Sequence, residues 1–150
     1  MKAVIQRVSQ SSVKVHGETL GQTSLGLLIL LGIEEIDNRT DVEWLAKKVI
    51  GLRIFSDEHG KMNLNIEAAG GELLVISQFT LHASTKKGTR PSFIKAARPE
   101  QAIPLYEAFI EECEKLIGKS VEKGKFGADM QVELINDGPV TITIDSQNKE

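Results

Sequence analysis

The sequence predicts a single α+β domain with a mainly antiparallel, barrel-like β-sheet and two main helices. Strand-like alternation of apolar and polar residues dominates both ends of the chain, and the two helical segments are grouped between strands. The chain has 150 residues, of which 41% are hydrophobic and 26% charged, as in an ordinary soluble domain. We expect the domain to cover residues 1–145 and residues 146–150 to form a loose tail.

The first elements are predicted to form an N-terminal hairpin. Residues Val4–Val15 alternate, and His16–Glu18 have the composition of a turn. Residues Leu20–Ile33 return as the second strand and contain the apolar run Leu27–Leu31.

A first helix is predicted after this hairpin. Thr40 and Glu43 have the spacing of a capping box, in which each side chain satisfies an unpaired backbone N–H. Apolar residues then recur at helical spacing, and Gly51 suits the helix end. These apolar residues are Val42, Leu45, Ala46, Val49 and Ile50. A short strand at Ile54-Phe55 and a turn at Asp57–Gly60 are expected to follow.

The second half predicts a buried strand and a second helix. Leu73–Ile76 form the strand, which continues into Ser77–Thr80. The helix is expected over Pro104–Ile117, because proline is tolerated in a first helical turn, and Gly118 stops it.

The last part of the chain predicts two more strands, at Met130–Leu134 and Val140–Ile144. Asn136–Pro139 lie between them, and their residue types favour a hairpin turn. The alternative is a functional one. The Gly138-Pro139 bond can adopt the cis form, which turns neighbouring carbonyls to one side as a rigid pair of acceptors.

The charge of the chain limits its possible partners. A net charge of −3 excludes a general nucleic-acid coat, so any RNA contact must be local. Lys86, Lys87 and Arg90 place three cations within five residues and could hold phosphates, although a solvated basic loop is the simpler interpretation.

The sequence offers no pattern of metal or haem ligands. Cys113 is the only cysteine, and the three histidines lie far apart in sequence, at no spacing typical of zinc or haem. Cys113 and Trp44 are interpreted as packing residues. The chain start lacks the apolar stretch of a signal peptide, and no apolar run could span a bilayer, so we expect a cytoplasmic location.

Ser77 and Thr80 are the first catalytic candidates, because they follow a buried strand. Hydroxyl groups at strand ends are more often structural, and no acid or histidine is placed by sequence to activate them. His82 would share a face with Thr80 in an extended strand, which makes a base role imaginable, but we expect a partly exposed polar histidine.

Two blocks of the sequence resemble the signature pair of the D-aminoacyl-tRNA deacylase family. They are Ser77–Ala83, which matches Ser-Gln-Phe-Thr-Leu-x-Ala, and Asn136–Thr141, which matches Asn-x-Gly-Pro-Val-Thr. Residues 3–8, 90–93 and 126–128 also look familial, so the resemblance spans nearly the whole chain. His82 occupies the variable position of the first block.

The resemblance implies a metal-independent hydrolase that cuts a D-amino acid, and also glycine, from the terminal adenosine of tRNA. It implies a homodimer in which Gly138 and Pro139 of one subunit enter the site of the other and reject L-amino acids by a clash. The catalytic residues would be Ser77, Gln78, Phe79 and Thr80. Phe126 and Met130 would pack on the adenine, although both could simply be core residues. The resemblance implies no metal, no organic cofactor, and no membrane or DNA partner.

Three alternatives remain at this point. The chain could be a non-enzymatic RNA-binding module that uses the Lys86–Arg90 loop, which predicts tRNA binding without ester cleavage. It could hydrolyse another small ester with Ser77 or Thr80, which predicts activity on esters lacking RNA. It could also be a structural domain that does neither.

Overall fold

The computed structural model describes residues Met1–Glu150, and a six-stranded sheet with two helices accounts for most of the chain. The strands of this sheet are β1 (Lys2–Val15), β2 (Glu18–Thr23), β3 (Gly26–Gly32), β6 (Glu72–Ser77), β7 (Glu122–Lys123) and β8 (Gln131–Asp145). The helices are α1 (Arg39–Gly51) and α2 (Pro99–Ile117), with a short 3₁₀ helix, η1 (Phe79–His82). A separate small hairpin contains β4 (Phe55–Ser56) and β5 (Met62–Leu64).

The sheet is mixed, which corrects the prediction of a mainly antiparallel one. Its order is β2-β1-β3-β6-β7, with β8 also paired to β1. Strand β1 is antiparallel to β2, β3 and β8, but β3–β6 and β6–β7 are parallel pairs. The reason lies in the connections, because α1 and the small hairpin carry the chain back across the sheet between β3 and β6. The parallel pair β3–β6 matters for function, since both strands end at the same edge.

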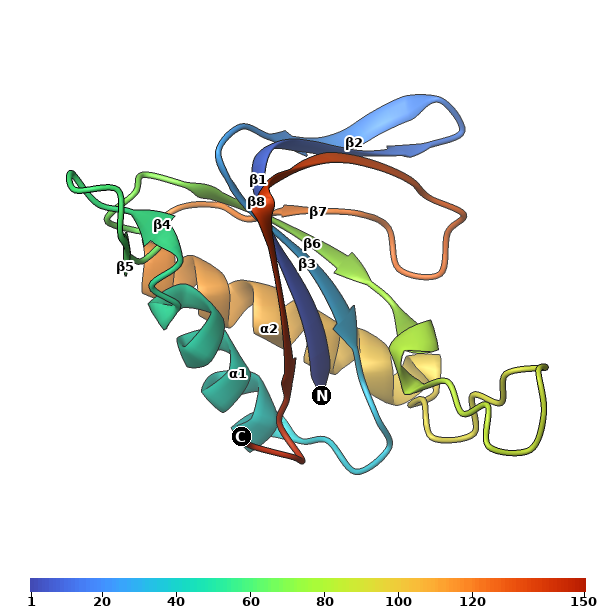
Figure 1. The fold of residues 1–150 in the computed structure, drawn as a ribbon. Coiled ribbons are helices and arrows are strands. Elements are labelled where there is room, and N and C mark those ends of the chain that lie inside the picture. The colour runs from blue at the N-terminus through green and yellow to red at the C-terminus, as the bar shows by residue number, and fades with distance from the viewer.

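The two outer strands of the sheet approach each other, so the sheet is nearly closed (Figure 1). Gly21 of β2 lies against β7, where an added Cβ would be only 3.2 Å from the Lys123 carbonyl oxygen. The single domain with two helices and a barrel-like sheet is thus as predicted, apart from the strand directions.

The predicted N-terminal hairpin is present, with its second strand divided into β2 and β3. His16 and Gly17 have φ angles of 50° and 79° and form the turn, which suits the twist of antiparallel strands. Residues 11–15 of β1 pair with β2, whereas residues 2–8 pair with β3. The chain therefore bends at Ser24-Leu25 to follow two different parts of the same long strand.

Both helices begin earlier than the sequence motifs predict. The N-cap of α1 is Asn38, not Thr40: its side chain accepts from Thr40 N at 2.8 Å, and Asp41 accepts from Asn38 N at 3.0 Å. Asn38 and Asp41 thus form the capping box in place of Thr40 and Glu43. Helix α2 begins at Pro99, which takes the first-turn role expected of Pro104.

Pro104 therefore lies inside α2, where it lacks the N–H that would bond to the carbonyl oxygen of Glu100. The end of α2 is as predicted, because Gly118 adopts a left-handed conformation with φ 73°.

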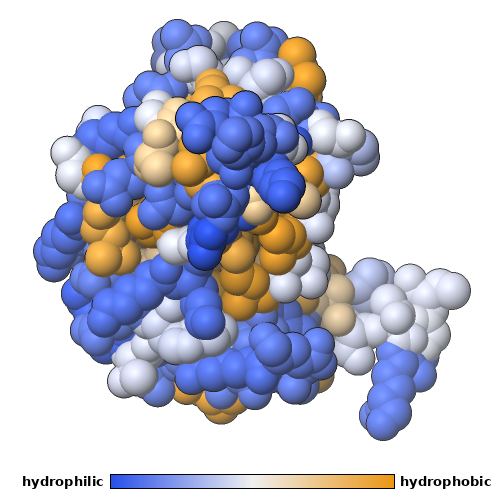
Figure 2. Space-filling model, turned by 60° about the vertical axis from the view of Figure 1, so that its left-hand side comes forward, coloured by the Kyte–Doolittle hydropathy of each residue, from blue (hydrophilic) through white to orange (hydrophobic).

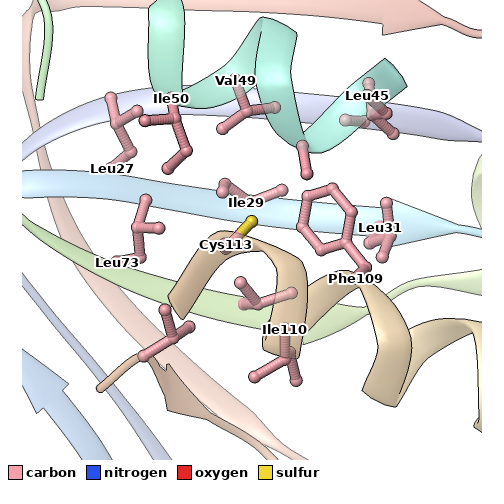
Figure 3. Packing of buried hydrophobic residues seen from close by; sticks show 14 of the residues in the cluster. Leu27, Ile29, Leu31, Leu45, Val49, Ile50, Leu73, Phe109, Ile110 and Cys113 are labelled. Carbon is pink, nitrogen blue, oxygen red and sulfur yellow. The ribbon is translucent and has the colours of Figure 1, made fainter. Parts of the chain in front are cut away.

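The core lies between the helices and one face of the sheet. In Figure 3, Phe109 and Cys113 of α2 face Val49 of α1 across the strand that carries Ile29 and Leu31. Cys113 is fully buried, as predicted, and burial raises the pKa of its thiol to about 12. A second, smaller cluster on the opposite face is covered by the first half of β8.

Strand β8 replaces the hairpin turn predicted at Asn136–Pro139. The segments Met130–Leu134 and Val140–Ile144 do not pair with each other, because both pair with the long strand β1. The register shifts near Val8, opposite the Asn136–Thr141 segment, and the Gly138-Pro139 bond is cis, as in the alternative prediction.

The C-terminal residues, predicted to be loose from Ser146 onward, begin with two anchored side chains. Ser146 is buried, and its hydroxyl accepts from the amino group of Met1 at 2.7 Å. Gln147 donates to Asp37 and Asp41 at 2.9 and 3.0 Å. Neither helix is long and apolar enough to cross a membrane.

Candidate active site

A cleft of about 280 Å³ opens where β3 and β6 end. Since these parallel strands finish side by side, with Leu31 opposite Ser77, the residues that follow them line the same hollow. The segment between β7 and β8 forms the other wall. Five residues predicted to be functional therefore meet here, namely Ser77, Gln78, Phe79, Phe126 and Met130.

Most of the cleft wall is apolar, and Phe126 and Met130 are part of it. Phe126 packs edge to face against Tyr106, with ring centroids 5.8 Å apart, and Met130 lies against the smaller hydrophobic cluster. Both side chains are only partly buried, so they are wall residues rather than core residues. Such a wall suits a flat aromatic group.

The short helix η1 presents backbone N–H groups at the edge of this cleft. Gln78 N donates to Leu31 O at 2.7 Å, which is the last bond to the sheet, and the chain then turns. Leu81 N donates to Gln78 O at 3.3 Å. The bond from Leu81 N is the first hydrogen bond of η1. The N–H groups of Phe79 and Thr80 come before it in the chain and have no partner in η1, so they are available to a bound oxygen.

Thr80 is exposed beside Gln78, whose side-chain amide donates to the Thr80 hydroxyl oxygen at 2.5 Å. This bond fixes the hydroxyl oxygen and leaves its hydrogen free to donate elsewhere. No carboxylate or imidazole bonds to Thr80, so nothing in the protomer activates it as a nucleophile.

His82 is buried, which corrects the prediction of a partly exposed side chain. It is 3% exposed, neither ring nitrogen has a hydrogen-bond partner, and Nδ1 lies 4.0 Å from a carboxylate oxygen of Glu34. The prediction assumed an extended strand, but a 3₁₀ turn rotates the side chain inward, against Gly32. His82 is therefore not a base for Thr80.

Gly138 and Pro139 do not line the cleft of their own protomer. They are exposed, yet the segment around them is held firmly. Arg7 Nε donates to Asp137 O at 3.1 Å, and Arg7 Nη1 donates to Ile54 O at 2.6 Å. Asn136 accepts from Val140 N at 3.1 Å and donates to the Thr141 hydroxyl at 3.0 Å. The segment Asn136–Thr141 is thus held in place by hydrogen bonds while Gly138 and Pro139 stay exposed.

The predicted basic residues lie outside the cleft, on the loop that follows η1. This loop is closed at its base by two backbone bonds between Ser84 and Ser92, of 2.8 and 2.9 Å. It stands clear of the rest of the molecule (Figures 1 and 2). Lys86, Lys87 and Arg90 are exposed on it and form no ion pair, so they are free to meet anions.

Sequence reasoning missed several residues of this region. Arg7 was given no role, although an arginine in the middle of an alternating strand is a signal for a specific partner. The apolar wall residues Leu31 and Ile33, at the end of β3, lie far in sequence from Ala97, and no local pattern links the two segments. No group of three or more histidine, cysteine or acidic side chains is gathered in a way that could hold a metal ion.

Comparison with known proteins shows the family of the chain. A family model described as D-Tyr-tRNA(Tyr) deacylase matches residues 4–145. A protein of Cytophaga hutchinsonii named D-aminoacyl-tRNA deacylase is 62% identical over 150 residues, covering the whole of both chains. One of the same name from Parabacteroides distasonis is 59% identical over the same extent.

Solved structures share the fold. A chain titled c-Myc DNA Unwinding Element Binding Protein superimposes with a TM-score of 0.91 at 41% identity, covering 97% of this chain and 98% of that one. A probable eukaryotic D-amino acid tRNA deacylase superimposes with a TM-score of 0.79, covering 95% and 97%. Because the two sequences are only 14% identical, this likeness shows a shared fold and no more.

Proposed function

The chain belongs to the D-aminoacyl-tRNA deacylase family, and from this we propose that it hydrolyses the ester between a D-amino acid and the 3′-terminal adenosine of tRNA. Glycine esters would be cleaved as well, because glycine has no side chain to be rejected. The observation that carries the proposal is the cleft at the ends of β3 and β6, which joins an apolar wall to free backbone donors.

The terminal adenine would enter the apolar part of the cleft. Phe126 and Met130 would pack on its faces, and stacking of a base on an aromatic ring is favourable for any nucleotide. The ribose, and the ester that it carries, would then lie toward Ser77, Gln78 and Phe79, which also line the cleft.

The ester carbonyl would then lie against η1. When water attacks, the carbonyl oxygen becomes an oxyanion, and the N–H groups of Phe79 and Thr80 would stabilise it. One donor of this kind is worth roughly 3–4 kcal/mol of barrier. Gln78 would orient the Thr80 hydroxyl toward the substrate, and Ser77 would support the local geometry.

The protein offers no general base at this position. We propose that the 2′-hydroxyl of the terminal ribose assists the attacking water. An RNA substrate would thus supply the group that the site lacks, and an ester on deoxyribose would be a poor substrate.

Chiral selection would come from a second subunit of a homodimer. Gly138 and Pro139 would enter the partner's cleft, where their carbonyl oxygens accept from the ammonium group of the substrate. The side needed by an L side chain would then be blocked, while a D side chain points to solvent. The support for this role is that the segment is exposed and yet fixed by Arg7 and Asn136.

The body of the tRNA would be held by local charge. Lys86, Lys87 and Arg90 stand on a projecting loop without ion-pair partners, which suits phosphate contacts in an otherwise acidic protein. Because aminoacyl-tRNA is used in translation, we propose that the protein acts in the cytoplasm.

One assay separates this function from its rivals. Purified protein is incubated with matched D- and L-tyrosyl-tRNA and with a D-tyrosyl ester that lacks the nucleotide, with and without a chelator. Rapid release from D-tyrosyl-tRNA alone, unchanged by the chelator, supports the proposal. Cleavage of the nucleotide-free ester would indicate a general esterase, and binding without cleavage would indicate an RNA-binding module.

A further inference from the structure

The rings of Phe79 and Phe93 form an exposed aromatic pair beside the cleft. Their centroids are 5.1 Å apart and their planes meet at 74°, in an edge-to-face arrangement. Phe79 is 55% exposed, Phe93 is partly exposed, and the neighbouring Ile94 is 85% exposed. Large apolar side chains gathered at the surface in this way indicate a contact with another molecule.

The aromatic pair lies between the cleft and the basic loop, the two parts of the molecule that would hold the substrate. Phe79 also lines the cleft that would hold the terminal adenosine. Phe93 follows Ser92, which closes the base of the loop that carries Lys86, Lys87 and Arg90. A single strand that leaves the cleft toward this basic loop therefore passes over the two rings.

We propose that Phe93, with Phe79 beside it, is a stacking site for the nucleotide that precedes the terminal adenosine, which in tRNA is a cytidine. This subsite rests on the function proposed above. Single-stranded RNA is held elsewhere by this combination of aromatic rings for the bases and cations for the backbone. The edge-to-face geometry suits it, because one ring supports the other while a face stays open.

The chemistry of the site favours a base over a second protein chain. The loop that closes at Ser92, next to Phe93, carries Lys86, Lys87 and Arg90 without ion-pair partners, and these cations complement a phosphate backbone. Stacking on a ring tolerates any base, so the site would add affinity for all tRNA ends without restricting the enzyme to one of them.

The direct test is a binding cycle with short single-stranded RNA that ends in CCA. A second oligomer has an abasic residue in place of the last cytidine. Fluorescence anisotropy should show that wild type binds the complete oligomer about tenfold more tightly. Phe93→Ala should remove this preference, whereas Phe93→Trp, which keeps a ring, should retain it. Leu20→Ala, at another exposed apolar side chain, is the matched control and should behave as wild type.

Catalysis supplies the second readout. Phe93→Ala should lower kcat/KM for D-tyrosyl-tRNA about tenfold and leave that for D-tyrosyl-adenosine, which lacks the preceding nucleotide, unchanged. Equal losses of kcat/KM on both substrates would overturn the proposal, since they would show that Phe93 only supports the conformation of η1 through Phe79. A dimer that dissociates in Phe93→Ala by sedimentation velocity, with the RNA preference intact, would also overturn it.

The subsite and the proposed function can fail separately. If wild type cleaves neither substrate, the deacylase function fails, while the oligomer cycle still decides whether Phe93 stacks on the base. If wild type cleaves D-tyrosyl-tRNA but binds the complete and abasic oligomers equally, the function stands and the stacking site is wrong.

Discussion

Arg7 of β1 holds the backbone of Asp137 in β8, because its Nε donates to the Asp137 carbonyl oxygen at 3.1 Å. The same guanidinium reaches Ile54 O through Nη1 at 2.6 Å, and its side chain is 11% exposed. One planar group thus ties the segment beside Gly138 to the loop after α1. The position of the proposed chiral gate depends on this fork.

Replacing Arg7 with lysine tests that dependence. Lysine keeps the charge but cannot donate to Asp137 O and Ile54 O in the same fixed geometry. We expect Arg7→Lys to lower kcat/KM for D-tyrosyl-tRNA at least about tenfold, because small displacements of positioning groups are costly. Lys14→Arg, at a partly exposed β1 residue, is the control. An unchanged kcat/KM in Arg7→Lys would show that the gate does not depend on Arg7.

Removing the Thr80 hydroxyl should reduce catalysis. Since Gln78 donates to this oxygen, its hydrogen is free to donate to the substrate, and we expect Thr80→Ala to lower kcat about a hundredfold. Thr80→Ser, which retains the hydroxyl, should recover most of the activity. Steady-state assays on D-tyrosyl-tRNA give both values. A Thr80→Ser variant as inactive as Thr80→Ala would show that the methyl group matters instead.

Mass spectrometry distinguishes the role of this hydroxyl. Because no base contacts Thr80, acid-quenched wild type should carry no covalent aminoacyl group. An aminoacyl adduct on Thr80 would establish the nucleophile mechanism in place of assistance by the ribose.

His82 is expected to be dispensable for the reaction. Its ring is buried with both nitrogens unpaired, so a non-polar residue of similar volume should cost nothing or stabilise the fold by about 1 kcal/mol. We expect His82→Leu to keep kcat within about threefold of wild type, and chemical denaturation to give the change in the free energy of unfolding. A large loss of kcat in a folded His82→Leu variant would show that His82 takes part in the reaction.

Stability should fall in alkaline solution as the Cys113 thiol titrates. Burial is the main cause that raises its pKa from 9.0 to about 12, so the unfolded chain loses this proton first. The resulting contribution to stability is complete below pH 9 and is lost as the pH rises toward 12. Denaturation of wild type and Cys113→Ala between pH 8 and 11 should show a steeper decline for wild type. Parallel declines would contradict the assignment to Cys113.

The sequence alone was sufficient where the signal is local. Gly118 ends α2 because the residue after the helix adopts a left-handed φ, which glycine reaches without strain. Cys113 is buried because it lies on an apolar helical face. Helix starts were less accurate, since Asn38 and Thr40 are both good caps and Pro99 and Pro104 both suit a first turn. Which one is used depends on the packing of the whole helix.

Long-range pairing explains the larger errors. The turn-like residues Asn136–Pro139 lie within β8, because β1 is long enough to pair on both sides of them. The parallel pairing of β3 with β6, and thus the cleft, depends on a crossover that no local pattern encodes. Only the family resemblance singled out Phe126 and Met130 beside Ser77, Gln78 and Phe79. The structure shows that these five residues line one cleft, while Thr80 lies outside its lining.

A mixed dimer of two inactive variants tests the shared site most directly. Thr80→Ala impairs the cleft, and Gly138→Ala should impair the gate, because Gly138 has φ 129° and an added Cβ would be 2.8 Å from Val140. If the gate serves the partner's cleft, a heterodimer of the two contains one cleft with intact Thr80 and an intact gate. We predict that co-expressed, differently tagged heterodimers recover about half of the wild-type rate on D-tyrosyl-tRNA. Heterodimers as inactive as both parents would contradict the cross-subunit gate.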